Sequence, residues 1–159
     1  MSKKSRPFPR RDFLKGVAFG GALVGIQLYQ GRGSTRGTAP ALDVVALSRV
    51  TPTEAPRLVH FWATWCGVCH AMEHNIRAFD AGEVTMVASA SGSAPEVTSW
   101  LNAENKSLDG VVVDRGGSAR TWGVSAYPTT FVVSQGEIRD VCIGYTTELG
   151  LRLRLALAA

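Results

Sequence analysis

Two cysteines separated by two residues, Cys66 and Cys69, constrain the fold more than any other feature, because a strand pattern precedes them and a helix pattern follows them. Residues 57–64 form an apolar, aromatic run that is typical of a buried strand. Over residues 66–79, apolar side chains recur at helical spacing, namely Val68, Met72, Ile76 and Phe79. The sequence therefore places Cys66 at the start of an amphipathic helix.

The position of Cys66 at the start of a helix predicts that the cysteine pair is reactive. A helix N-terminus offers unpaired backbone N–H groups and the positive end of the helix dipole, and both favour the thiolate of Cys66. The thiolate is the nucleophile in disulfide exchange. Cys69, one helical turn later, can attack the mixed disulfide that Cys66 forms. The remaining cysteine, Cys142, falls on a predicted strand, where a free cysteine usually acts as a small buried hydrophobe.

The rest of the chain predicts one α/β domain over residues 42–159. We expect further strands over 84–90 and 111–113 and a hairpin formed by 129–134 and 138–143. We expect helices over 95–105, 117–122 and 147–159. In the last segment, leucines alternate with a strand-like period of two, but Leu, Arg and Ala are strong helix formers.

Residues 1–41 have the layout of an export signal, with a basic stretch before the uncharged run 16–29. Arg10 and Arg11, followed by Asp-Phe-Leu-Lys, resemble the twin-arginine export motif, although Pro9 stands where Ser or Thr is usual. The apolar run has 14 residues, fewer than the ~20 that cross a bilayer core. We expect a flexible connection over 31–41, in which Ala39-Pro40-Ala41 fits a signal-peptidase site. A cleaved leader and a retained inner-membrane anchor both stay open.

The distribution of charge argues against nucleic acid as a partner. Residues 1–36 contain eight of the 17 Lys and Arg but one of the 13 acidic residues. The other residues therefore carry nine bases against twelve acids. A nucleic-acid-binding domain carries its basic patch on the folded part, so the positive charge here belongs to the leader.

The run Phe61-Trp62-Ala63-Thr64-Trp65-Cys66-Gly67-Val68-Cys69 resembles the active site of thioredoxin-like proteins of the bacterial envelope. Tyr127-Pro128-Thr129 resembles the cis-proline loop that faces the dithiol in that family. The resemblance covers residues 42–159. Within the superfamily, the chain looks closest to the D protein of the suppressor-for-copper-sensitivity group and to TlpA-like proteins.

The resemblance implies a thioredoxin fold, in which helices flank a central mixed sheet. It also implies that Cys66 attacks, that Cys69 resolves the mixed disulfide, that Trp65 packs against the dithiol and that the Tyr127–Pro128 peptide bond is cis. The spacer Gly67-Val68 lacks the proline of thioredoxin, and spacer residues tune the reduction potential. The direction of electron flow therefore stays open, with a reductant as our expectation.

His60 lies six residues before Cys66, where thioredoxins carry a buried acid that is thought to move a proton during exchange. An imidazole titrates near neutral pH and could do this work. Alternatively, His60 only packs in the core, which is the interpretation that we favour.

Two other classes of function remain as alternatives. Cys66, Cys69 and His70 match the C-x-x-C-H attachment motif of c-type haem, but a mixed α/β pattern surrounds them. With His74, the same residues could supply sulfur and nitrogen ligands to zinc or copper.

Our expectation is a periplasmic disulfide oxidoreductase, exported or anchored at the inner membrane. It acts on protein cysteines, needs no cofactor beyond its dithiol, and contributes to copper tolerance through the repair of oxidised thiols. A membrane redox partner is implied by the family.

Overall fold

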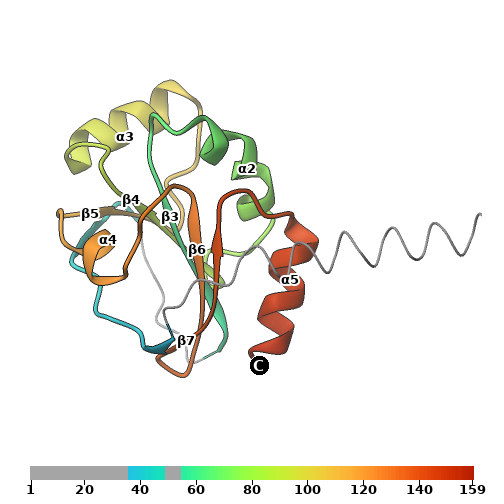
Figure 1. The fold of residues 1–159 in the computed structure, drawn as a ribbon. Coiled ribbons are helices and arrows are strands. Elements are labelled where there is room, and N and C mark those ends of the chain that lie inside the picture. Colours follow the sequence, from blue (N-terminus) through green and yellow to red (C-terminus); the bar gives the residue numbers. More distant parts are fainter. Residues whose placement is uncertain (1–35, 49–54) are drawn as a thin grey trace, which may run out of the picture.

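The computed structural model describes residues 36–48 and 55–159 (Figure 1). The predicted leader motif at Arg10 and Arg11 and the apolar run 16–29 lie outside the described residues. Among the residues that are described, none belongs to a helix long and apolar enough to cross a membrane.

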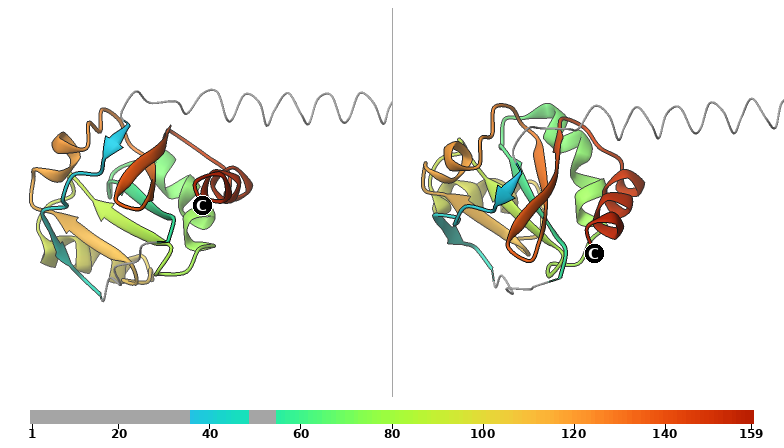
Figure 2. Two further views of the ribbon diagram at one scale, coloured as in Figure 1. Left: turned by 90° about the horizontal axis from the view of Figure 1, so that it is seen from below. Right: turned by 60° about the horizontal axis from the view of Figure 1, so that its bottom comes forward.

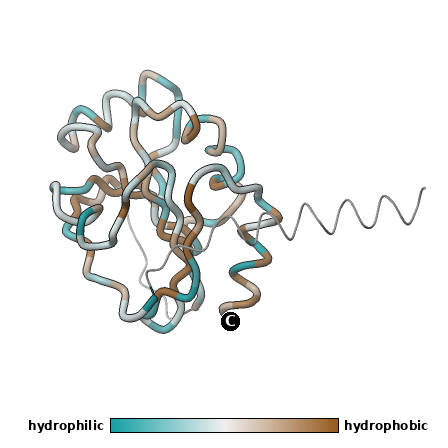
Figure 3. Tube along the Cα trace, viewed as in Figure 1, coloured by the Kyte–Doolittle hydropathy of each residue, from teal (hydrophilic) through white to brown (hydrophobic). Residues whose placement is uncertain are grey.

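A seven-stranded mixed sheet forms the centre of the domain, in the order β1-β7-β6-β3-β4-β5-β2. The strands are β1 (Gly37–Thr38), β2 (Val44–Ala46), β3 (Arg57–Trp62), β4 (Val84–Ala88), β5 (Val111–Asp114), β6 (Thr129–Ser134) and β7 (Glu137–Ile143). Strands β3, β4 and β5 run parallel, whereas β6 pairs antiparallel with β3 and with β7. Apolar residues gather in these central strands (Figure 3).

Helices cover both faces of the sheet. They are α2 (Gly67–Arg77), α3 (Ala94–Ala103), α4 (Ser118–Thr121) and α5 (Glu148–Leu157). Helices α2, α3 and α5 pack on one face, and α4 lies on the other with the segment that follows β1. Figure 2 shows α5 beside α2 on the same side of the sheet. This arrangement is the thioredoxin fold that the resemblance implied.

Strand β3 is buried on both faces, as its continuous apolar run predicted. Leu58 and Trp62 pack beneath α2, whereas Phe61 joins the opposite core. There the Phe61 ring lies 5.6 Å from Trp122 and 5.7 Å from Phe131, measured between ring centroids. Successive side chains of a strand point to opposite faces, so the strand that leads to the cysteines contributes to both cores.

The structure differs from the expectations at the first two strands. The expected flexible connection over residues 31–41 is described from residue 36 onward, and there Gly37–Thr38 pairs antiparallel with the start of β7. Strand β2, which pairs with β5, had no distinct signal in the sequence. Both strands are so short that their extended backbone depends on pairing with a neighbouring strand and not on a pattern of their own. The predicted C-terminal helix is confirmed as α5.

Candidate active site

Cys66 is the N-cap of α2, the position that the sequence predicted. Its backbone is extended, and its Sγ accepts a hydrogen bond from the backbone N–H of Cys69 at 3.1 Å. The first residues of the helix, Gly67 and Val68, are exposed. The sulfur therefore sits among the N–H groups that have no partner inside the helix, where a negative charge is stabilised.

Cys66 and Cys69 form a disulfide bond, with their Cα atoms 5.2 Å apart. Only 6% of Cys66 and 3% of Cys69 is exposed, so the pair lies at the rim of the core. Trp65, in contrast, is 65% exposed directly before the pair. The surface directly before the disulfide is therefore an exposed indole ring, whereas the two cysteines are nearly covered.

Trp65, the residue before the disulfide, contacts a second aromatic side chain. The Trp65 indole N–H donates to the carbonyl oxygen of Ala90 at 2.8 Å, and its ring meets Tyr127 edge to face at 5.9 Å between centroids. The peptide bond between Tyr127 and Pro128 is cis, the isomer that the resemblance implied. The Pro128 carbonyl accepts the N–H of Gly144 at 2.7 Å, which connects this loop to the end of β7.

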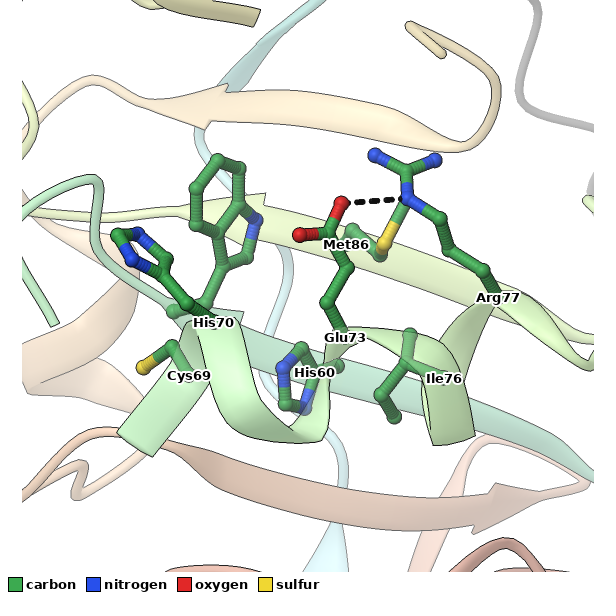
Figure 4. A pocket seen from close by; sticks show the side chains of 8 residues that line it. His60, Cys69, His70, Glu73, Ile76, Arg77 and Met86 are labelled. Carbon is green, nitrogen blue, oxygen red and sulfur yellow. Dashed lines mark hydrogen bonds and ion pairs between the residues drawn. The ribbon is translucent and has the colours of Figure 1, made fainter. Parts of the chain in front are cut away.

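Behind the disulfide lies a small cavity of about 20 Å³ between α2 and the sheet (Figure 4). Its lining includes His60, Trp62 and Cys69. His60 is 3% exposed, and its Nδ1 lies 2.8 Å from the hydroxyl oxygen of Thr130. Burial lowers the pKa of His60 from 6.5 to about 3, so the imidazole is neutral at physiological pH.

Glu73 also lines this cavity, and the sequence analysis did not single it out. Its carboxylate binds Arg77, four residues later on α2, at 2.7 Å, and it also pairs with Lys106. Burial tends to raise the pKa of Glu73, but the hydrogen bonds from Lys106 and Arg77 outweigh this and keep it below its usual value. A signal was present, because Glu73 follows Cys69 by four residues and so lies on the same side of the helix.

The two histidines of the alternative interpretations lie on the exposed side of α2. His70 stacks on Trp100, with ring centroids 5.3 Å apart. Residues 36–48 and 55–159 contain no group of three or more His, Cys, Asp or Glu side chains placed to hold a metal ion. For the haem-attachment alternative, Cys66 and Cys69 lie in a mixed α/β fold and are joined to each other.

Cys142 lies on β7 and is 1% exposed, with no disulfide partner. Burial raises the pKa of its thiol to about 11. It therefore stays protonated, in agreement with its predicted role as a small buried hydrophobe.

Comparisons with known proteins agree with this geometry. The sequence profile of the family described as a thioredoxin-like domain matches residues 44–156. A thioredoxin-like protein of Haemophilus influenzae is 31% identical over 105 residues, which are 65% of this chain and 63% of the relative. The thiol:disulfide interchange protein DsbE of Xylella fastidiosa is 30% identical over 82 residues, 50% of this chain and 42% of the relative. The chain thus spans less than two thirds of the length of these curated relatives.

Among solved structures, a putative thiol:disulfide interchange protein DsbE from Chlorobium tepidum superposes with a TM-score of 0.60 at 21% identity. The match covers 81% of this chain and 96% of that one. At this level of identity, the likeness concerns the fold.

Proposed function

Because the chain belongs to the thioredoxin-like family, we propose that it is a thiol–disulfide oxidoreductase that acts on protein cysteines through Cys66 and Cys69. The observation that carries this proposal is the cysteine pair itself. Cys66 caps the N-terminus of α2, the disulfide that it forms is almost buried, and the residue before it carries an exposed indole ring.

In the reduced protein, the Cys66 thiolate attacks one sulfur of a substrate disulfide, and the other substrate sulfur leaves as a thiolate. Cys69 then loses its proton and attacks Cys66, which forms the Cys66–Cys69 bond and releases the second substrate sulfur. Two electrons pass from the protein to the substrate. The N–H of Cys69, which points at the Cys66 sulfur, supports the charge on Cys66 in the first step.

The finer parts of the proposal concern direction and place. We propose a reductant that is reset by a dithiol partner in the membrane and works in the periplasm, with residues 1–41 as a leader or an anchor. The support is the order of charges and apolar residues in the leader. The chain resembles the suppressor-for-copper-sensitivity and TlpA-like group. We therefore propose that its substrates are protein cysteines that copper has oxidised.

The test combines three variants in an insulin-reduction assay. Cys66→Ser should abolish turnover, and Cys69→Ser should accumulate mixed disulfides with substrate. Cys142→Ala is the matched control, because it removes the buried thiol outside the site. Normal turnover by Cys66→Ser would refute the proposal.

A reduction potential for the Cys66–Cys69 pair tests the direction. Thioredoxin has a reduction potential of about −270 mV, and a similar value here would agree with a reductant. DsbA has a potential of about −120 mV, and a value close to that would make the protein an oxidant.

A further inference from the structure

The outward side of α5 is apolar, although it faces solvent. Leu149, Leu153 and Leu157 are spaced four residues apart, so they lie in one row along the helix. Leu149 is 70% exposed, Leu153 36% and Leu157 74%. Ala156, which is also exposed, lies beside this row. These four side chains are called the leucine face of α5 below.

The inward side of the same helix carries a charge. Arg154 is 2% exposed and pairs with Asp140 of β7, beside Leu151 in the core. A surface helix usually turns its apolar residues to the core and its charged residues to solvent. Packing within the domain therefore does not account for the leucine face. A contiguous exposed apolar patch indicates a surface that contacts another molecule or a membrane.

The chain enters the domain at the C-terminal end of the leucine face. Arg36, the first residue that the structure describes, borders a groove of about 530 Å³ that Leu157 also lines. Gln135 and Arg139, from the hairpin of β6 and β7, line the same groove. Two cationic side chains therefore adjoin the end of the leucine face.

A third arginine flanks the row of leucines along the helix. Arg152 is exposed on α5, where its guanidinium group binds Glu148 at 2.7 Å. Arg139 likewise binds Glu137, at 3.0 Å. Both arginine side chains are still more than 40% exposed, at 48% and 42%. Exposed apolar residues on a helix with cations at their border are typical of helices that lie on an anionic bilayer.

The sequence places a long apolar segment within reach of this face. Residues 16–29 carry no charge, and the connection over residues 30–36 can span at most about 25 Å. A membrane that holds residues 16–29 is therefore about 25 Å or less from Arg36. Contact between the leucine face and that membrane is then intramolecular, so a small contact area is enough.

Two protein occupants fit the leucine face less well. Specific protein interfaces use about 20–30 residues on each side, whereas this face consists of four side chains on a helix about 15 Å long. A second copy of the chain therefore has too little to hold. The run 16–29 has no charged side, so lying on one row of leucines would leave most of its own apolar surface in water.

We propose that the leucine face of α5 lies on an anionic bilayer, with the leucines in the interface and Arg36 and Arg139 against lipid phosphates. The inference rests on the proposed function, because it takes residues 1–41 as an anchor, one of the two possibilities given there. Two attachments to one bilayer fix the orientation of a domain, whereas a single tether lets it turn. Helix α5 lies beside α2, which Cys66 caps (Figure 2). The dithiol therefore meets a membrane redox partner in one orientation.

Spin labels on the oxidised full-length chain test this orientation. Cys66 and Cys69 are joined and Cys142 is buried, so a single introduced cysteine takes the label. Leu149→Cys places it at the end of the leucine face that is farthest from Leu157 and from the anchor. The vesicles contain phosphatidylglycerol and phosphatidylethanolamine. Collisions are measured with oxygen, which concentrates in hydrocarbon, and with a water-soluble nickel complex, which hydrocarbon excludes.

On vesicles, the label of Leu149→Cys should gain collisions with oxygen and lose most of its collisions with nickel. The matched control is Thr121→Cys on α4, an exposed position on the other face of the sheet, and its label should keep its nickel collisions. Adding Leu157→Ser to Leu149→Cys should lower the ratio of docked to undocked label about tenfold, because one leucine leaves the interface.

The role of the arginines is tested in the same way. Arg36→Gln combined with Arg139→Gln should lower the ratio of docked to undocked label about fivefold or more on the anionic vesicles. On vesicles of phosphatidylcholine alone, the double variant should equal its parent. Arg115→Gln removes an exposed arginine three residues before α4 and should change neither ratio.

Three outcomes would overturn the proposal. If the chain floats with the vesicles but the label of Leu149→Cys keeps its nickel collisions, the anchor holds and the docking is wrong. A label that is shielded from both reagents shows that protein covers the face, either a second copy or residues 1–35. A chain that does not float with the vesicles excludes the anchor and the docking together. The dithiol chemistry is judged separately, by the turnover of Cys66→Ser.

Discussion

The buried imidazole of His60 should make the folded state sensitive to mild acid. Its pKa falls from 6.5 in the unfolded chain to about 3 in the folded one, because burial disfavours the charged ring. Between these values, the unfolded state binds one more proton than the folded state. The contribution of the neutral His60 ring to the free energy of unfolding is therefore fully present above about pH 6.5, and it is lost progressively as the pH falls toward about 3.

The magnitude follows from this difference. Each pH unit below 6.5 removes about 1.4 kcal/mol, so from about pH 7.5 to about pH 5 the free energy of unfolding should drop by about 2 kcal/mol. Glu73 adds little in this window, because its lowered pKa keeps it ionised there. The loss therefore belongs mainly to one side chain.

Urea unfolding of the oxidised protein, followed by tryptophan fluorescence at several pH values and constant ionic strength, measures this loss. His60→Asn keeps an amide group beside the Thr130 hydroxyl but does not titrate, so its stability should fall by about 2 kcal/mol less than that of the wild type over the same range. The control variant His74→Asn removes an exposed imidazole from α2. Because the buried His60 ring remains, this variant should lose nearly as much stability over the pH range as the wild type. If His60→Asn loses as much stability as the wild type, the assignment to His60 is wrong.

Three further predictions concern the leader, the core and a loop. Replacing both Arg10 and Arg11 with Lys should block export of a folded reporter, measured by cell fractionation, if the twin-arginine pathway reads the pair; unimpaired export would exclude that pathway. Phe131→Ala removes the ring that packs on Trp122 at 5.0 Å, and denaturant unfolding should show a loss of about 3–5 kcal/mol. Asp114→Ala removes the carboxylate that accepts backbone N–H groups at the start of α4, and calorimetry should show a loss of about 2 kcal/mol; an unchanged melting temperature would contradict the capping role.

The elements that surround the cysteines were predictable because local signals agreed with tertiary burial. Strand β3 is apolar throughout and is buried on both faces, and α2 carries its apolar residues at helical spacing. In α5, two local signals conflicted. The leucines alternate like a strand, but the segment is helical, with Leu151 inside and Leu149 70% exposed. Intrinsic helix propensity, together with an N-cap at Thr147, prevailed over the alternation.

The features that the sequence did not predict depend on contacts between distant residues. Strand β1 has two residues and forms only because the start of β7 is available to pair with it. One ion pair of Glu73 depends on Lys106, which is 33 positions later in the chain. A cavity of one water's size is a property of packing, and no pattern along the chain encodes it.

The burial of Cys142 has a practical consequence for anyone who counts thiols in this protein. A thiol-specific reagent needs both access and a thiolate, and Cys142 offers neither, because it is 1% exposed and burial raises its pKa to about 11. Cys142 should therefore stay unreacted in the native protein, whether the active-site pair is reduced or oxidised, and should become reactive in denaturant. The alkylation pattern thus separates the redox state of the active-site pair from the folded state of the chain, and a third thiol that reacts under native conditions marks molecules whose core has opened.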